Sequence, residues 1–246
     1  MQTIRVIWRG VLLAFHLSLG MLLTPFVTRQ DKQGYWLVNH RIASWWHGRV
    51  VRILGIEIST SGTPPVPPAM VVANHISWLD IILLGHLLPT CFLSKSEVRQ
   101  WPVIGWLAMR TGTLFIRRGG GEAGSVSGTI GTHLQHEGML TLFPEGTTTN
   151  GRHVRPFFSR LFAAAIETGA PLAPVAISYR VDGEHDPLAP YIGDQSLGEN
   201  LLGLLRRRRS QVHIHFSPPI PSQGMTRKAL GEQARNAIVQ ALEAWP

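Results

Sequence analysis

A histidine and an aspartate lie five residues apart where a predicted strand gives way to a helix. The apolar run Met70–Ala73 leads into Asn74 and His75, and a helix is expected to begin near Ser77, with Asp80 in its first turn. At this junction the two side chains can meet, although residues five apart on one continuous helix are about 140° apart. A carboxylate that accepts one ring N–H makes the other nitrogen a better base. The pair indicates a general base, or else a helix cap beside a histidine that satisfies backbone groups.

Three further strand-like runs carry polar or unusual residues. Residues 112–118 read GTLFIRR and precede three glycines, so paired arginines at a strand end could bind phosphate or lie solvated at a sheet edge. Residues 142–149 read LFPEGTTT, where Glu145 could hold substrate hydroxyls or belong only to a turn. Ala170–Ile177 contains two prolines, which indicates an edge strand or a distortion near a site.

Alternating strands and helices must position these residues. The predicted strands are Met70–Ala73, Thr90–Ser94, Thr113–Ile116, Met139–Phe143, Leu172–Tyr179 and Gln211–Phe216. The predicted helices are Ser77–Leu88, Trp101–Arg110, Ala123–His136, Pro156–Thr168 and Met225–Ala244. Short apolar strands separated by helical patterns predict an α/β fold in which helices cover a sheet. Ser59–Pro68 is expected to be a turn-rich connection.

In this order and spacing, the four runs resemble the motifs of the glycerolipid acyltransferase family, the lysophosphatidic acid acyltransferases. The first motif, N-H-x-x-x-x-D, is matched by Asn74, His75 and Asp80. The second, G-x-x-F-I-x-R, is matched by Gly112, Phe115, Ile116 and Arg118. The third, F-P-E-G-T-R-S, is matched by Phe143, Pro144, Glu145, Gly146 and Thr147. The fourth, an apolar strand with proline that ends P-V, is matched by Pro171, Pro174 and Val175.

The resemblance covers about residues 35–220 and also includes a lysine–glutamate stretch at Lys95-Ser96-Glu97. It implies a mixed central sheet covered by helices. It also implies transfer of a fatty acyl group from acyl-CoA or acyl-carrier protein to the free hydroxyl of a lysolipid. The expected acceptor is 1-acylglycerol 3-phosphate, which would give phosphatidic acid. No metal and no cofactor beyond the acyl donor are expected.

The resemblance also implies roles for individual residues. His75 takes the hydroxyl proton and Asp80 orients it, with no acyl-enzyme intermediate. Arg118 binds the acceptor phosphate, and Lys95 is a weaker choice for the same anionic pocket. The remaining residues expected at the substrate are Asn74, Gly112, Phe115, Glu145, Gly146 and Thr147.

The chain departs from the family pattern at Thr148 and Thr149, where many members carry Arg-Ser, and at Arg117, which replaces a frequent aspartate. The missing arginine would help to hold an acceptor phosphate. Lyso-ornithine lipid or another lysophospholipid is therefore the alternative acceptor. A catalytically idle lipid-binding protein on a membrane surface is the alternative from a different class, and the intact His75 and Asp80 argue against it.

The N-terminus predicts attachment to a membrane. Val11–Val27 is mostly apolar with basic residues on both sides, but its 17 residues span only about 25 Å of a hydrocarbon core of about 30 Å. The alternatives are a signal peptide, for which no good cleavage site follows, and a buried helix. Tyr35–Leu54 reads as a Trp- and Arg-rich helix, either interfacial or packed on the domain. We expect residues 1–58 to anchor the chain at the cytoplasmic face of the inner membrane and residues 59–246 to form the acyltransferase domain.

The charge balance indicates an anionic partner. The net charge is +8, 20 of the 23 basic residues are arginine, and residues 1–123 hold 12 Lys/Arg against 5 Asp/Glu. Anionic lipid or a phosphorylated substrate fits this excess, whereas no sequence signature supports nucleic-acid binding. With 44% hydrophobic and 15% charged residues the chain is neither disordered nor polytopic, and one cysteine excludes an internal disulfide. His133/His136 and His213/His215 show metal-ligand spacing but no third ligand.

Overall fold

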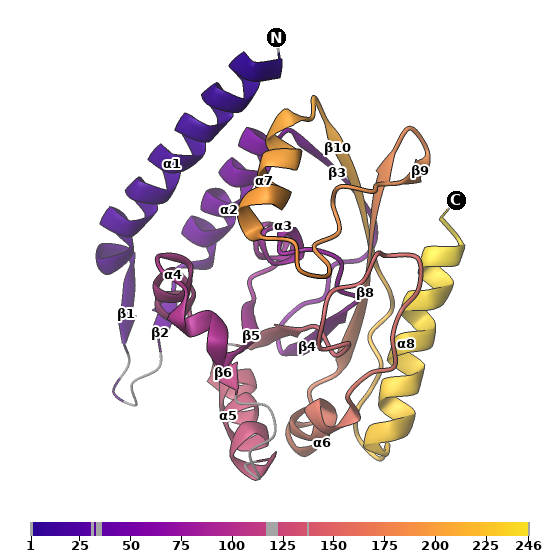
Figure 1. Cartoon of the computed structure of the whole chain (residues 1–246). Helices are drawn as coiled ribbons and strands as arrows, with labels where there is room; N and C mark the ends of the chain where they lie inside the picture. Colours follow the sequence, from indigo (N-terminus) through magenta and orange to yellow (C-terminus); the bar gives the residue numbers. More distant parts are fainter. Residues whose placement is uncertain (1, 31, 33–35, 117–122, 137, 246) are drawn as a thin grey trace.

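A mixed sheet forms the centre of the molecule, and its strands follow the order β3-β10-β8-β4-β7-β5-β6, with β9 beside β8 (Figure 1). The computed structural model describes residues 2–30, 32, 36–116, 123–136 and 138–245. In these residues β8, β4, β7, β5 and β6 are parallel, while β10 is antiparallel to β8 and parallel to β3. The sheet strands are β3 (Ile56–Gly62), β4 (Ala69–Ala73), β5 (Cys91–Lys95), β6 (Leu114–Ile116), β7 (Met139–Leu142), β8 (Leu172–Val181), β9 (Glu184–His185) and β10 (Ser210–Phe216). The predicted α/β class with a mixed central sheet is confirmed.

Helices cover both faces of this sheet. On one face lie α1 (Gln2–Val27), α2 (His40–Leu54), α3 (Leu79–Leu87) and α7 (Leu197–Arg206); on the other lie α5 (Ala123–His136), α6 (Ala163–Thr168) and α8 (Arg227–Glu243). The alternation along β4 explains the two layers, because Val71 packs toward the first group and Met70 and Val72 toward the second. All five residues of β4 are buried, as expected for a parallel strand covered on both sides.

The topology gathers the motif segments at one edge. Because β4, β7, β5 and β6 are adjacent and parallel, their carboxyl ends lie at the same edge of the sheet. The first motif follows β4, the third follows β7, Lys95 ends β5, and the second motif contains β6. Ligands of parallel α/β sheets bind at this edge, so the fold itself indicates where to look for a site.

Several expected elements differ from the observed ones. Residues 59–62 are not a turn: they belong to β3, because the Ser59 and Ser61 hydroxyls hydrogen-bond His213 and His215 of the neighbouring β10. The expected boundary between residues 58 and 59 thus lies inside a strand. The expected helix from Tyr35 begins only at His40, where the Asn39 side chain accepts the backbone N–H groups of Arg41 and Ile42. Before it, β2 (Trp36–Val38) pairs with β1 (Thr28–Gln30).

Smaller corrections concern other helix ends. The expected helix from Trp101 begins only at Ile104, as α4 (Ile104–Arg110), and the 3-10 turn η1 (Ser96–Gln100) lies before it. The expected helix from Pro156 begins as η2 (Ser159–Phe162), which continues into α6. The start of α8 follows Thr226, whose hydroxyl accepts the backbone N–H of Ala229. The sequence analysis did not predict α7, whose N-terminus is stabilised by a capping box between Ser196 and Glu199.

The first helix has two unlike faces. Leu13, His16, Gly20 and Thr24 are buried against the domain. The outer stripe, on the opposite side, is exposed and consists of Ile4, Trp8, Val11, Phe15, Leu22 and Phe26. Among the described helices, α1 alone is long and apolar enough to cross a membrane, with a mean hydropathy of 1.9 and 22% of that stretch buried. The buried-helix alternative does not fit so exposed a segment.

Candidate active site

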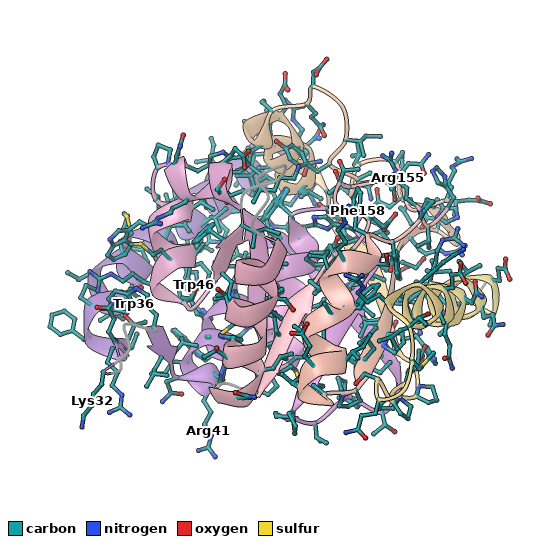
Figure 2. The ribbon with its side chains drawn as sticks, turned by 90° about the horizontal axis from the view of Figure 1, so that it is seen from below. Lys32, Trp36, Arg41, Trp46, Arg155 and Phe158 are labelled. Atoms are coloured by element: carbon teal, nitrogen blue, oxygen red, sulfur yellow. The ribbon has the colours of Figure 1, made fainter. Side chains whose placement is uncertain are left out.

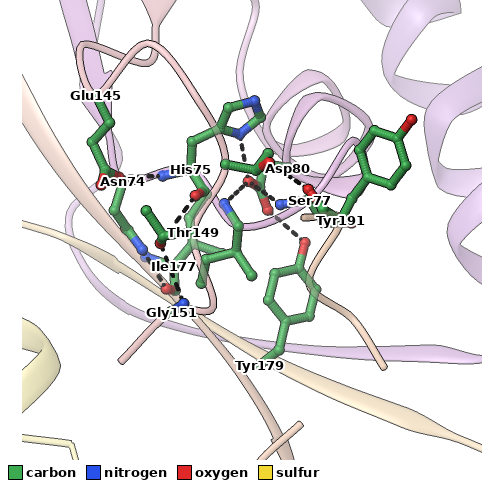
Figure 3. Close-up of polar contacts among 12 residues, drawn as sticks. Asn74, His75, Ser77, Asp80, Glu145, Thr149, Gly151, Ile177, Tyr179 and Tyr191 are labelled. Atoms are coloured by element: carbon green, nitrogen blue, oxygen red, sulfur yellow. Dashed lines mark hydrogen bonds and ion pairs between the residues drawn. The ribbon is translucent and has the colours of Figure 1, made fainter. Parts of the chain in front are cut away.

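Backbone and side-chain contacts fix His75 in place (Figure 3). Its backbone N–H donates to Glu145 Oε1 at 2.8 Å, and its carbonyl accepts the backbone N–H of Thr149 at 2.8 Å. The imidazole stacks on the ring of Phe143, with centroids 4.0 Å apart, and its Nδ1 lies 2.8 Å from Asp80 Oδ2. The side chain remains 17% exposed, so a substrate can still reach it. These contacts hold the imidazole of His75 in one fixed orientation.

Asp80 is completely buried and accepts four hydrogen bonds. Its Oδ2 accepts the backbone N–H groups of Ile76 at 2.7 Å and Ser77 at 2.9 Å, besides His75 Nδ1. Its Oδ1 accepts the Tyr179 hydroxyl at 2.6 Å. These backbone bonds explain why α3 begins at Leu79 rather than Ser77, since the chain turns around the carboxylate first. Asp80 therefore orients the histidine and holds the turn before α3, and no side chain caps the helix at Trp78 as the capping interpretation expected.

Tyr179 is a site residue that the sequence patterns missed. It comes from β8, 99 residues after Asp80, and is 3% exposed. Burial raises its pKa well above the usual value, and the charge of Asp80 adds to this shift, so the phenol stays protonated and donates to the carboxylate. A tyrosine inside an apolar strand is expected to pack against other apolar side chains, so the local sequence does not indicate this contact. It is seen only in three dimensions, where β8 pairs with β4.

Glu145 positions the backbone of the site. Its Oε1 accepts from His75 N–H and its Oε2 from Arg155 N–H, each at 2.8 Å, and it is 3% exposed. Burial raises its pKa, and the two N–H donors oppose that shift. Gly146 follows with φ +71°, which a residue with a side chain rarely adopts, and completes the turn. The carboxylate is therefore directed at the protein's own backbone, while Thr147 lies half-buried after it.

Asn74 joins β4 to β8 beyond their last regular pair. Its side-chain amide donates to the Ile177 carbonyl at 2.9 Å and accepts the Ile177 N–H at 2.8 Å. Of the two alternatives for the proline-containing strand, an edge strand or a distortion near a site, the edge is excluded, because β8 lies between β10 and β4. Pro174 lacks a backbone N–H, yet the strand stays paired through its neighbours and through Asn74. Asn74 thus fixes the backbone from which His75 projects.

The two threonines that replace Arg-Ser bind backbone groups. Besides its N–H contact, Thr149 directs its hydroxyl to the His75 carbonyl at 3.4 Å. The Thr148 hydroxyl donates to the Tyr191 carbonyl, and Tyr191 N–H donates to the Ile76 carbonyl at 2.9 Å. Both side chains therefore fasten the loop around His75, and neither supplies a cation for an acceptor phosphate.

The remaining predicted residues lie on neighbouring strands. Lys95 ends β5 and is exposed, and Phe115 is half-buried on β6 opposite Ser94. These strands are the second and third from β4, about 10 and 14 Å away at the usual strand spacing. Gly112 has φ +78°, and an added Cβ would lie 2.9 Å from Cys91 Sγ, so it serves the turn into β6. Arg117 and Arg118 lie outside the described residues, and the role expected of Arg118 stays a prediction.

The histidine pair on β10 has hydroxyl partners. Ser61 Oγ lies 2.8 Å from His213 Nε2 and 2.8 Å from His215 Nδ1, and Ser59 Oγ lies 2.8 Å from His213 Nδ1. Across the described residues no group of three His, Cys, Asp or Glu side chains could hold a metal ion. Cys91 is buried at the start of β5.

The arrangement suits removal of a proton from a bound hydroxyl. With Nδ1 directed at Asp80, Nε2 is the ring nitrogen that can accept a proton. In the described part of the chain no serine, threonine or cysteine side chain hydrogen-bonds the imidazole, unlike a nucleophile activated for a covalent step. The geometry is therefore that of a His–Asp pair whose free ring nitrogen can take a proton from a bound hydroxyl.

Comparison with known proteins identifies the family. The Acyltransferase family profile matches residues 28–178. The chain is 44% identical over 98% of its length to the lyso-ornithine lipid O-acyltransferase of Pseudomonas aeruginosa, covering 95% of that protein. It is 29% identical over 66% of its length to the 1-acyl-sn-glycerol-3-phosphate acyltransferase of Neisseria meningitidis, covering 64% of it. The chain belongs to the acyltransferase family.

A solved structure shares the fold. The crystal structure of the 1-acyl-sn-glycerophosphate (LPA) acyltransferase PlsC from Thermotoga maritima aligns with a TM-score of 0.71, covering 99% of this chain and 97% of that one at 18% identity. The protein is thus an O-acyltransferase that acts on a lysolipid, as predicted, rather than an idle lipid-binding protein.

Proposed function

We propose that the acceptor is a lyso-ornithine lipid. The observation that carries this proposal is the 44% identity along almost the whole chain to an enzyme named for that acceptor. The third motif supports it, since Thr148 and Thr149 bind backbone at the positions where the family motif has Arg-Ser. An ornithine head group has one carboxylate and one ammonium and needs less positive charge than a phosphate. The acceptor 1-acylglycerol 3-phosphate remains the alternative.

In the proposed mechanism, His75 Nε2 takes the proton of the acceptor hydroxyl as its oxygen attacks the thioester carbonyl. Asp80 balances the charge of the imidazolium that forms, and its four hydrogen bonds keep it in place. The tetrahedral intermediate then collapses, the C–S bond breaks, and the imidazolium returns the proton to the leaving thiolate. Acyl transfer thus needs no covalent enzyme intermediate.

A panel of lysolipids tests the acceptor. Purified protein is given one acyl thioester and, in separate reactions, lyso-ornithine lipid, 1-acylglycerol 3-phosphate and another lysophospholipid, with the His75→Ala variant as background. The proposal expects the largest kcat/KM with lyso-ornithine lipid. A larger value with 1-acylglycerol 3-phosphate would assign the phosphate acceptor instead.

We further propose that α1 embeds from one side in the cytoplasmic leaflet of the inner membrane. The helix is held along the domain, since Arg9 Nη1 donates to the Arg207 carbonyl at 2.7 Å and its other end continues into β1. Its outer stripe, with Ile42 and Trp45 of α2, is exposed and would gain about 1.5 to 3 kcal/mol per large side chain buried. Basic residues beside it would attract anionic lipids.

Point substitutions on the outer stripe test this placement better than deletion, because α1 also covers core residues. The variant Val11→Ser/Phe15→Ser/Leu22→Ser should move much of the protein to the soluble fraction of a cell lysate. The matched control replaces the exposed Val66 and Leu188 with serine. Equal membrane fractions in wild type and both variants would contradict the one-sided anchor.

A further inference from the structure

A loop that follows all four motifs is attached to the segment around His75. It comprises residues 186–196, between β9 and α7. Tyr191 N–H donates to the Ile76 carbonyl at 2.9 Å, and the Tyr191 carbonyl accepts the Thr148 hydroxyl. Ile76 directly follows His75, and Thr148 lies in the third motif. The middle of the 186–196 loop is therefore bonded to both segments that surround the imidazole.

A buried amide holds the same loop from behind. Asn200 Nδ2 donates to the carbonyls of Leu188 and Pro190, each at 3.1 Å. Asn200 Oδ1 accepts Trp78 Nε1 at 2.8 Å, and Trp78 lies in the turn before α3. The loop and the start of α3 thus share one hydrogen-bonded support. Such a support keeps Tyr191 in place before a substrate binds, which lowers the ordering cost of binding.

The phenol of Tyr191 is available to a substrate. The residue is half-buried, and in the part of the chain that the structure describes its hydroxyl makes no hydrogen bond. In Figure 3 its ring points to the same side of the view as the imidazole of His75, whereas Tyr179 meets Asp80 from the other side. A phenol donates one hydrogen bond and accepts others. Tyr179 uses its donor on Asp80, so Tyr191 is the tyrosine here that keeps a donor for a ligand.

The third motif supplies no cation beside this phenol. The hydroxyl of Thr148 lies where the family motif has arginine, and it binds the Tyr191 carbonyl. Arg155, whose backbone N–H binds Glu145, has an exposed side chain, and Figure 2 shows it on the opposite side of the molecule from Lys32. A phosphate group favours the charged fork of an arginine, whereas a carboxylate with a single charge is well served by a neutral hydroxyl donor. The chemistry at Tyr191 therefore fits a carboxylate.

We propose that Tyr191 determines acceptor specificity: its hydroxyl donates a hydrogen bond to the carboxylate of the ornithine head group, and Thr148 positions it. The inference rests on the proposed lyso-ornithine acceptor and names the side chain that recognises its head group. The carboxylate does not react, so the contact stabilises the bound substrate and the transition state equally. Its loss therefore raises KM and leaves kcat nearly unchanged.

Paired changes in enzyme and substrate test the contact. Wild type and Tyr191→Phe, which removes only the hydroxyl, are assayed with lyso-ornithine lipid and with its carboxamide analogue, whose head group lacks the negative charge. With lyso-ornithine lipid, KM should rise about 10-fold in the variant, while kcat stays within a factor of about 2. With the carboxamide, the KM values of variant and wild type should differ by less than about 3-fold.

Two further variants separate recognition from loop packing. Thr148→Val keeps the shape of the side chain and removes its hydroxyl, so it should also raise KM rather than lower kcat. Combined with Tyr191→Phe it should add little, because both act on one contact. The matched control Ile192→Val removes one carbon from the exposed neighbour of Tyr191 and should change neither constant.

Three outcomes would overturn the inference: an unchanged KM in Tyr191→Phe, equal losses with lyso-ornithine lipid and its carboxamide, or a loss confined to kcat. The first two mean that the hydroxyl does not recognise the carboxylate, and the third that Tyr191 acts on the reacting atoms. Failure of the proposed acceptor is read from wild type alone, as a preference for 1-acylglycerol 3-phosphate, and the inference then falls with it. Failure of the inference alone shows only in the variants, with wild type still acylating lyso-ornithine lipid.

Discussion

The sheet edge around His75 and the α1–α2 layer differ in how densely their buried polar groups are hydrogen-bonded. At the edge, Asp80 accepts four hydrogen bonds and Glu145 two, and the amide of Asn74 makes two. Only the Ser77 hydroxyl lacks a partner in the described part of the edge. In the helical layer, the buried His16 Nε2 lies 3.0 Å from the Trp46 carbonyl, while Trp46 Nε1 is buried without a described partner. The edge is thus ordered by a dense network around three side chains, whereas the layer has separate hydrogen bonds such as Ser44 Oγ to the His86 carbonyl at 2.6 Å.

Close packing between α2 and α3 also orders the helical layer. A Cβ added to Gly85 of α3 would lie 2.6 Å from His47 Cε1, and one added to Gly48 of α2 would lie 2.6 Å from His86 Cε1. Each helix therefore places a histidine ring over a glycine of the other. Hydrogen-bonded geometry suits a reaction centre, whose atoms must stay aligned. Shape packing leaves the outer surface of the layer free to be apolar, as a membrane contact requires.

The largest expected effect is at the edge. His75→Ala should lower kcat by about 10²- to 10⁴-fold, the usual cost of losing a general base. The protein should remain folded, because the residue is partly exposed and its backbone contacts to Glu145 and Thr149 do not need the ring. Steady-state kinetics and a thermal melt measure both. Activity within a few-fold of wild type in folded protein would refute the proposed mechanism.

An intermediate effect is expected in the helical layer at acid pH. Burial lowers the pKa of His47 to about 4, with smaller contributions from the charges of His86 and His16, while the unfolded chain binds this proton near pH 6.5. The contribution to stability is therefore complete above about pH 6.5 and is lost as the pH falls toward 4. Its size is about 3 kcal/mol.

The variant His47→Phe isolates this contribution, because it keeps a ring over Gly85 and removes the titration. Urea unfolding of wild type and variant at several pH values gives the difference in unfolding free energy. That difference should change by about 3 kcal/mol in favour of the variant between pH 6.5 and 4. A difference that does not vary with pH would show that His47 accepts a proton in the folded state without cost.

Local patterns predicted one half of the site and missed the other. His75 and Asp80 are five residues apart at a strand-to-helix junction, so their contact follows from local geometry. Tyr179 is 99 residues from Asp80 and Asn74 is 103 from Ile177, and only the pairing of β8 with β4 brings them together. The strand β3 was missed because serine and threonine indicate a turn unless a neighbouring strand offers them partners. Hydrogen bonds between residues far apart in the chain produce no periodic pattern in a single sequence.

The smallest expected effect is that of a substitution at Tyr179, which tests whether this residue positions the Asp80 carboxylate or only packs in the core. Tyr179→Phe removes one of the four donors to Asp80 and keeps the ring in the core. A hydrogen bond to a charged group contributes about 1.5 to 3 kcal/mol, so kcat should fall about 10-fold if the bond aligns the carboxylate. The less neutralised carboxylate should also stabilise the imidazolium more strongly. The acidic limb of the pH–rate profile should then move to higher pH.

Tyr179→Leu, which removes the ring as well, is the packing control. If Tyr179→Phe lowers the melting temperature but leaves kcat and the pH profile unchanged, Tyr179 only fills the core and the orientation of His75 depends on the other three donors.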